Sequence, residues 1–278
     1  MLAPVPTASD LYLDLLKRCL TRLIFAEEDY VEVVLDRPGW QRWPGRAVEA
    51  VTRKVGVRLI HAEPPATADR LIGRDWPQHG ETMVGLARLD NIQMCVEQVL
   101  ADDVPGDLIE TGVWRGGASI FMRGILAAHG VADRRVWLAD SFAGLPPPDV
   151  TLHPADEGLT FHESDTLAVG VDEVKANFER YGLLDDQVRF LPGWFSETLP
   201  EAPVEQLAVL RLDGDMYGST IDALEPLYPK LSVGGYVIVD DYHIDPCRKA
   251  VEDYRAAHGI DDEIVMIDRN AAYWRRSS

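Results

Sequence analysis

Leu207-Ala-Val-Leu-Arg-Leu-Asp-Gly-Asp-Met-Tyr-Gly218 decides the fold, together with Gly234-Gly-Tyr-Val-Ile-Val-Asp-Asp-Tyr242. Each stretch begins with an apolar run rich in Val, Leu or Ile and ends in aspartates. Neither run has the three-to-four-residue spacing of an amphipathic helix, so both are typical of buried parallel strands. Parallel strands that lie side by side end at the same edge of the sheet, which is where ligands bind in open α/β proteins.

Aspartates gather at this predicted edge. Asp213 and Asp215 follow the first run, and Asp240 and Asp241 follow the second. Converging carboxylates repel one another unless a positive charge lies between them, and a hard divalent cation prefers oxygen ligands. A single aspartate in such a place is more often a cap for the loop or helix that follows. For the four together, a metal site is the favoured hypothesis.

The composition excludes several classes of protein. The chain has 278 residues, of which 46% are hydrophobic and 26% charged, as expected for a globular protein with a sizeable core. Its formal charge of −19 argues against binding to nucleic acid or anionic membranes and favours a neutral or cationic small molecule. There is no apolar stretch long enough to span a bilayer and no secretory signal, and the three cysteines are scattered. We therefore expect a cytoplasmic protein with reduced thiols.

From about residue 83 onward the sequence alternates between strand and helix patterns, which predicts a mostly parallel, doubly wound sheet. The last two strands have a short connection and are expected to pair antiparallel. The predicted strands are Asp107–Thr111, Arg135–Ala139, Gln187–Leu191, Leu207–Leu212, Tyr236–Val239, Glu263–Ile267 and Ala271–Arg275. The predicted helices are Ala8–Ala26, capped by Ser9 or Asp10, Met83–Leu100, Gly117–Ala128, Val171–Tyr181, Thr220–Leu231 and Pro246–His258.

The stretch Glu27–Gly80 has an irregular pattern with several Trp and Pro residues, although short helices near Ala47–Val55 and Ala66–Leu71 fit it. Long irregular segments inside compact domains are usually functional lids. We therefore divide the chain into an N-terminal helix and lid segment (1–81) and a Rossmann-like domain (82–278).

A glycine-rich turn follows the first strand of that domain, in Glu110-Thr-Gly-Val-Trp-Arg-Gly-Gly117. Glycine lets the backbone approach a ligand closely, and the acidic Glu110 before it suits an ammonium group better than a pyrophosphate. Asp140, at the tip of the next strand, is placed to accept hydrogen bonds from ribose hydroxyls. An adenosine with an amino-acid tail needs both features, which points to S-adenosylmethionine. Trp194 fits adenine stacking and a core position equally well.

The segments PGDLIETGVWRGG, VWLADSFAGLP, GLLDDQVRFLPGWF, LAVLRLDGDMYGST and GGYVIVDDY resemble the macrocin O-methyltransferase family. That family includes the sugar O-methyltransferases of mycinamicin and novobiocin biosynthesis. The resemblance covers about Leu11–Ala26 and Thr82–Arg276 and fades across Glu27–Gly80. It implies a class I methyltransferase fold, S-adenosylmethionine, Mg²⁺ and methyl transfer to a deoxysugar hydroxyl of a glycosylated antibiotic scaffold.

The resemblance also implies roles for individual residues. Asp213, Asp240 and Asp241 become the metal ligands, and Asp215 becomes the general base, on the same side as Asp213 if the chain is extended there. The divergent lid segment becomes the determinant of acceptor choice. The cofactor contacts become Thr82, Met83, Glu110, Thr111, Gly112, Val113, Trp114, Asp140, Ser141, Phe142, Ala143, Gly144, Gly193, Trp194 and Phe195.

Other readings stay open at this point. His243 is a second candidate base, although a loop histidine near acidic residues is the simpler interpretation. Tyr217 fits a place in the acceptor pocket or plain packing. Methylation of a catechol-like phenol, a dinucleotide-dependent oxidoreductase and a non-catalytic binding protein are the competing functions. A homo-oligomer is compatible with the sequence.

Overall fold

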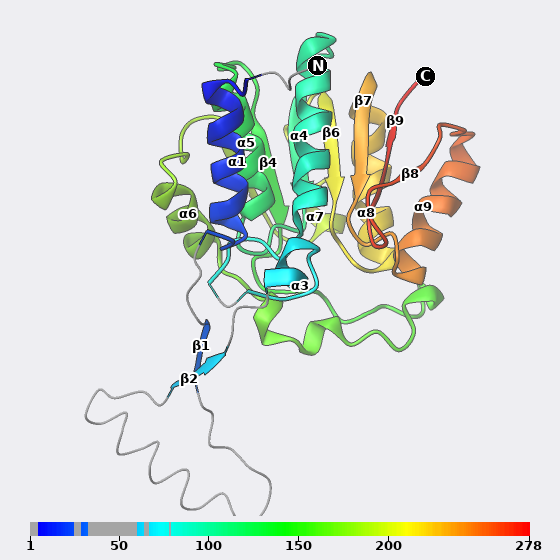
Figure 1. Cartoon of the computed structure of the whole chain (residues 1–278). Helices are drawn as coiled ribbons and strands as arrows, with labels where there is room; N and C mark the ends of the chain where they lie inside the picture. The colour runs from blue at the N-terminus through cyan, green and yellow to red at the C-terminus, as the bar shows by residue number, and fades with distance from the viewer. Residues whose placement is uncertain (1–4, 25–28, 33–59, 64–66, 78) are drawn as a thin grey trace, which may run out of the picture.

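The structure, a computed structural model, describes residues 5–24, 29–32, 60–63, 67–77 and 79–278. A seven-stranded sheet lies between two layers of helices (Figure 1). Its strands are β3 (Asp107–Thr111), β4 (Val136–Asp140), β5 (Val188–Pro192), β6 (Leu207–Leu212), β7 (Leu231–Val239), β8 (Val265–Met266) and β9 (Ala272–Arg275).

The strand order is β5-β4-β3-β6-β7-β9-β8. The five strands from β5 to β7 are parallel, and β9 pairs antiparallel with both β7 and β8. The chain runs outward from β3 in one direction and returns to start β6 on the other side. The order therefore reverses between β3 and β6, which is the kind of point where open α/β sheets bind ligands.

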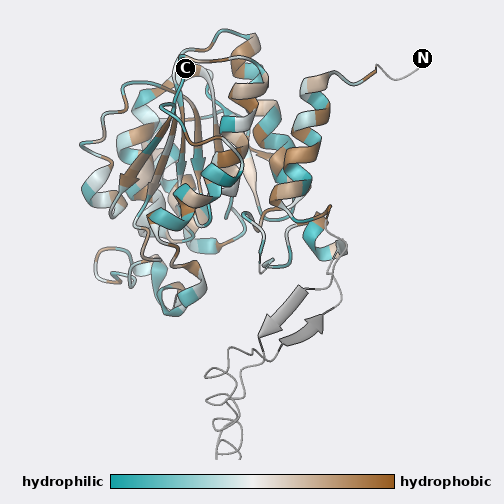
Figure 2. Cartoon of the chain, turned by 90° about the vertical axis from the view of Figure 1, so that its left-hand side faces the viewer, coloured by the Kyte–Doolittle hydropathy of each residue, from teal (hydrophilic) through white to brown (hydrophobic). Residues whose placement is uncertain are grey.

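Helices cover both faces of this sheet and close two apolar cores. One core joins the sheet to α1 (Ala8–Leu20), α4 (Leu86–Ala101), α5 (Gly117–Ala128) and α6 (Val171–Arg180), and the other joins it to α8 (Tyr217–Leu227) and α9 (Asp245–His258). All six residues of β6 are buried, because both of its faces are covered. Figure 2 shows the central strands as the most hydrophobic part of the fold.

The class of fold and the order of elements from α4 onward are as the sequence predicts, apart from the short helix α7 (Phe195–Thr198), which it did not predict, and shifts at the ends of elements. β7 begins five residues before the predicted Tyr236, and α8 begins at Tyr217 and ends at Leu227, where Pro226 stands in its last turn. The predicted cap of α1, Ser9 or Asp10, was wrong. Thr7 is the N-cap, because its side chain accepts the N–H of Asp10, and the Asp10 side chain accepts the N–H of Thr7 in return, which forms a capping box. α1 also ends at Leu20, six residues before the predicted end.

Little of the predicted lid segment is described. The short strands β1 (Asp29–Glu32) and β2 (Ile60–Glu63) pair antiparallel, and α3 (Thr67–Leu71) matches the helix expected near Ala66–Leu71. The helix expected at Ala47–Val55 lies outside the described residues. The leucines of α1 belong to the same core as α4 and α5, and the domain boundary at residue 81 stays a prediction.

Within the described part of the chain, no helix combines the length and the apolar character needed to cross a bilayer.

Candidate active site

A cavity of about 540 Å³ opens at the C-terminal edge of β3, β4, β6 and β7. Its wall contains most of the residues that the sequence assigned to a site. These are Thr82, Met83, Glu110, Gly112, Val113, Trp114, Asp140, Ser141, Gly144, Gly193, Trp194, Phe195, Asp213, Asp215, Asp240 and Asp241. The fold thus brings the glycine turn and the aspartates of both strand ends into one space.

Three of the expected cofactor contacts lie outside this wall. The Thr111 side chain is buried beneath it, and its Oγ1 donates to the backbone carbonyl of Arg211. Phe142 packs against Phe190, with the ring centroids 6.1 Å apart. Ala143 is exposed and its N–H binds the Ser141 hydroxyl. These residues support the turns around the cavity and do not line it.

The glycine turn lies directly against the end of β6. Gly112 has a left-handed φ of 89°, and a Cβ added there would lie 1.7 Å from the carbonyl oxygen of Asp213. Only glycine can occupy that position, because a side chain would collide with backbone that cannot move away. The contact places the predicted cofactor turn next to the predicted metal ligands.

Asp140 holds the glycine turn from the neighbouring strand. One carboxylate oxygen accepts the N–H of Val113 at 2.6 Å, and the other accepts the N–H of Phe142 at 2.7 Å. Burial raises the pKa of Asp140, and these backbone hydrogen bonds oppose that shift. The carboxylate therefore shapes the turn itself, and the ribose contact expected from the sequence stays a prediction.

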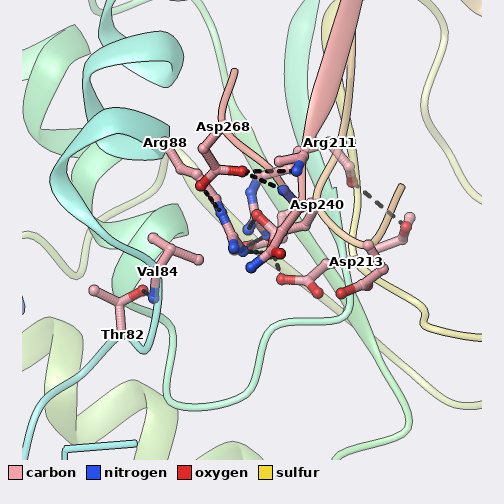
Figure 3. A network of polar contacts seen from close by, with 12 residues as sticks. Thr82, Val84, Arg88, Arg211, Asp213, Asp240 and Asp268 are labelled. Carbon is pink, nitrogen blue, oxygen red and sulfur yellow. Dashed lines mark hydrogen bonds and ion pairs between the residues drawn. The ribbon is translucent and has the colours of Figure 1, made fainter. Parts of the chain in front are cut away.

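Two arginines lie among the carboxylates, and the sequence reasoning missed both (Figure 3). Arg211, at the end of β6, is 1% exposed. Its Nη1 lies 2.5 Å from Glu110 Oε1 and 2.6 Å from Asp213 Oδ2, and its Nη2 lies 2.5 Å from Asp240 Oδ1. The signal was present in the sequence, since an arginine inside a buried apolar strand needs anionic partners.

Arg88 approaches from α4 on the other side. Its Nη1 forms an ion pair with Asp240 Oδ2, and its Nε donates to Asp268 Oδ2 at 2.9 Å. Asp240 therefore has one oxygen on each arginine. No local pattern in the sequence marks Arg88, because it is 152 residues away from this partner.

The three predicted metal ligands have oxygens within 4.8 Å of one another. Burial and the charges of Asp215, Asp213 and Asp240 raise the pKa of Asp241 well above its usual value. Burial also raises the pKa of Asp213, and Arg211 opposes that shift. The neighbouring carboxylates therefore still add to the pKa shift of Asp241, although two arginines lie in the cluster.

Asp215 lies beside this cluster, but the chain is not extended there. Its φ of 58° is left-handed, so the condition under which Asp213 and Asp215 would face the same way, an extended chain, is not met. The N–H of Asp215 donates to Asp241 Oδ2 at 3.2 Å. Burial, with the charges of Asp213 and Asp240, raises the pKa of Asp215 to about 7.

Glu110 is almost fully buried, and both of its oxygens are engaged. Oε1 binds Arg211 and Oε2 accepts the Ser119 hydroxyl. Burial raises the pKa of Glu110 to about 7, and the charge of Arg211 opposes the shift. With both oxygens bound, Glu110 holds Arg211 and Ser119 at the end of β3. A ligand ammonium group would have to share the Glu110 oxygens with these two residues.

The remaining candidates divide between the cavity and its surroundings. His243 lines the cavity, and its backbone N–H donates to the Asn270 carbonyl at 2.9 Å. Tyr217 lies outside the wall, because its hydroxyl donates to Asp253 on α9. The wall also contains Trp76, one of the tryptophans of the predicted lid segment, and four residues that the sequence did not single out, Phe161, Leu167, Ser219 and Asp222.

Comparison with known proteins gives concordant results. A family model described as macrocin-O-methyltransferase (TylF) matches residues 9–276. The 8-demethyl-8-(2,3-dimethoxy-alpha-L-rhamnosyl)-tetracenomycin-C 4'-O-methyltransferase of Streptomyces olivaceus is 55% identical over 98% of this chain and 94% of its own length. The mycinamicin III 3''-O-methyltransferase of Micromonospora griseorubida is 49% identical over 98% of both chains. The solved structure of the O-methyltransferase NovP has a TM-score of 0.82 and 48% identity, and the match covers 97% of this chain and all of that one.

Proposed function

The chain belongs to the macrocin O-methyltransferase family and is an S-adenosylmethionine-dependent O-methyltransferase, and we propose that its acceptor is a deoxysugar hydroxyl on a glycosylated natural product. Membership of this family shows that the oxidoreductase and the non-catalytic binding protein considered from the sequence were wrong. The observation that carries the proposal is the single cavity that joins the glycine turn to the carboxylates.

The relatives support a sugar as the acceptor. The tetracenomycin enzyme is named for a rhamnosyl compound methylated at position 4', and the mycinamicin enzyme is named for position 3'' of its substrate. The cavity wall also contains Ser219 and Asp222, which offer hydrogen-bond partners to hydroxyls. Trp76 and Phe161 add apolar faces against which a sugar ring or an aglycone can pack.

We also propose that the site uses Mg²⁺, held by Asp213, Asp240 and Asp241. The donors fit, because they are hard carboxylate oxygens that lie close together. The charge fits as well. The carboxylate cluster (Glu110, Asp213, Asp215, Asp240 and Asp241) holds five carboxyl groups around the two guanidiniums of Arg88 and Arg211, and Arg88 is shared with Asp268, so a divalent cation would reduce the repulsion within the cluster. A bound Mg²⁺ would lower the pKa of a coordinated sugar hydroxyl.

The chain's own residues account for the rest of the proposed reaction. Asp215, whose pKa is raised towards neutrality, accepts the proton that the acceptor hydroxyl loses. Gly112 and Asp140 fix the turn that binds the methyl donor, and they set its distance from the carboxylate cluster. Positioning of donor and acceptor at about 3 Å and exclusion of water then supply much of the rate.

The experiment is a methyl-transfer assay with labelled S-adenosylmethionine against rhamnosylated tetracenomycins, mycinamicin-type macrolides, aminocoumarin glycosides, free deoxysugars and catechols. Each acceptor is tested with Mg²⁺, after EDTA, and after EDTA followed by excess Mg²⁺. We expect transfer to a glycoside, loss of turnover in EDTA and its recovery with Mg²⁺. Transfer to catechols alone would show that the acceptor is a phenol and not a sugar. Full activity in metal-free enzyme would show that the reaction does not need Mg²⁺.

A further inference from the structure

Arg88 stands out because it contacts Asp240 from an element that carries none of the predicted metal ligands. Its side chain extends from the first turn of α4 into the cavity wall and is 8% exposed. Figure 3 shows its guanidinium between Asp240 and Asp268. A long flexible side chain is held in one place here by two charged partners.

Asp268 connects this guanidinium to a second wall of the cavity. Its Oδ1 accepts the N–H groups of Asn270 and Ala271 at 2.7 and 2.8 Å, which closes the turn between β8 and β9. The Asn270 carbonyl then accepts the N–H of His243, in the loop after Asp240. Arg88 thus contacts the end of β7 directly through Asp240, and it is connected through Asp268 and Asn270 to the loop that contains His243.

We propose that Arg88 is a positioning residue that fixes the Asp240 carboxylate for metal binding, an inference that rests on the proposed function. An ionised carboxylate has about four acceptor positions, and the two arginines take one on each oxygen. The two contacts prevent rotation of the Asp240 carboxylate, so its remaining acceptor positions keep one orientation towards a metal ion. The same guanidiniums hold Asp240 near Asp213 and Asp241 before a cation arrives, against their mutual repulsion.

A variant of Arg88 tests the orientation of Asp240 more specifically than a variant of Arg211 would. Arg211 binds Glu110 and Asp213 as well as Asp240, so its removal disturbs the cofactor strand and two ligands together. Arg88 is paired with Asp240 alone among the three predicted ligands, and its second partner, Asp268, lies outside the cavity wall. A change at Arg88 therefore removes a direct contact from one ligand only, although its charge also acts on Asp213.

The test measures Mn²⁺ binding by electron paramagnetic resonance in the full-length protein, with no acceptor and no turnover. Arg88→Gln removes the charge and both contacts, and we expect the Kd for Mn²⁺ to rise about 10–100-fold, the usual effect of losing a group that orients a metal ligand. Arg88→Lys keeps the charge but cannot span both carboxylates, so its Kd should fall between those of the wild type and Arg88→Gln. Arg248→Gln is the matched control, because Arg248 pairs with Asp245 and Glu252 on the surface of α9. Its Kd should equal that of the wild type.

Calorimetry with S-adenosylhomocysteine on the same samples distinguishes positioning from support of the whole cavity. We expect unchanged affinity in both Arg88 variants, and circular dichroism confirms that they fold. Should Arg88→Gln not fold, Arg88→Lys carries the comparison. The inference is overturned if Mn²⁺ binds both variants as tightly as the wild type or more tightly, which the loss of a positive charge alone would favour, or if S-adenosylhomocysteine affinity falls as much as Mn²⁺ affinity. Wild-type protein that binds no Mn²⁺ would instead overturn the metal in the proposed function, and this inference with it.

Discussion

At the scale of single residues, the site depends on how buried charges are shared. Asp240 is bound by two arginines, whereas Asp241 and Asp215 have no cationic partner among the described residues. Burial and neighbouring carboxylates raise the pKa values of Asp241 and Asp215. The unequal sharing suggests unequal roles, with Asp240 fixed in place and Asp215 able to exchange a proton.

Asp215→Asn tests the proposed base. The amide keeps the size of the side chain but cannot accept a proton, so kcat should fall by about 10²–10⁴-fold, the usual range for loss of a general base. Binding of Mn²⁺ and S-adenosylhomocysteine should change little. Stopped-time assays at saturating substrates and Mg²⁺ give kcat.

Asp213→Asn is the comparison for that variant. Asp213 is a proposed metal ligand, so its loss should weaken the metal, and excess Mg²⁺ should partly restore turnover. If Asp215→Asn is the variant that Mg²⁺ restores, or if it turns over at the normal rate, the base lies elsewhere. His243, which also lines the cavity, would be tested next.

At the scale of elements, the turn between β3 and α5 is fixed by contacts on two sides. Gly112 lies against the Asp213 carbonyl, and Asp140 accepts the N–H of Val113. The turn also reaches the loop after β4, because Trp114 Nε1 donates to the Thr166 carbonyl at 2.9 Å. The position of the proposed cofactor site therefore depends on three strands and not on the glycine motif alone.

Gly112→Ala should destroy this arrangement. The new methyl group would lie 1.7 Å from a backbone oxygen, so β3 and β6 would have to separate where they pair. We expect S-adenosylhomocysteine binding to be lost and the free energy of unfolding to fall by several times the cost of a left-handed alanine, which is about 1–2 kcal/mol. Urea unfolding and calorimetry measure the two effects.

Gly130→Ala is the matched control. Gly130 also has a left-handed φ, 66°, but a Cβ there would meet nothing within 4 Å. It should lose only about 1–2 kcal/mol and keep its full affinity for S-adenosylhomocysteine. Equal effects of the two substitutions would mean that the close approach of Gly112 to Asp213 is unimportant.

At the scale of the whole molecule, an apolar core packs against each face of the sheet, and ion pairs connect elements at the periphery. Arg123 on α5 pairs with Asp185, just before β5, and the Asp185 side chain is 42% exposed. The hydrogen bond from Arg123 lowers the pKa of Asp185. This ion pair connects a helix of one core to the edge strand of the sheet, and neither residue lines the cavity.

Asp185→Asn tests the contribution of this ion pair through its pH dependence. A carboxylate whose pKa is lower in the folded state stabilises the fold above its unfolded-state pKa of about 3.9, and this contribution is lost as the pH falls through the folded-state pKa. We expect the variant to be less stable than the wild type by about 1 kcal/mol at pH 7, a small value because the pair is partly exposed. The difference should shrink as the pH falls below about 4. Urea unfolding at several pH values measures it, and Asp186→Asn, at the exposed neighbouring aspartate, is the control. A difference that stays constant with pH would show that ionisation of Asp185 does not stabilise the fold.

The amino-acid sequence determined the order of strands and helices, the antiparallel end of the sheet and the edge at which the aspartates gather. These features follow from short-range patterns, because the alternation of apolar runs with turns is a property of neighbouring residues. The end of a buried run also places Asp213, Asp240 and Asp241 without further information. The family resemblance rested on the same local segments.

Only the tertiary structure decided which charges meet. Arg88 lies 152 residues from Asp240, and Arg211 lies 101 residues from Glu110, so neither pairing leaves a trace in a local pattern. The left-handed turn at Asp215 and the use of Asp140 to hold the glycine turn likewise depend on backbone from another strand. Ion pairs and close backbone contacts depend on distance in space. That distance is set by the packing of helices on the sheet and not by the separation of residues in the sequence.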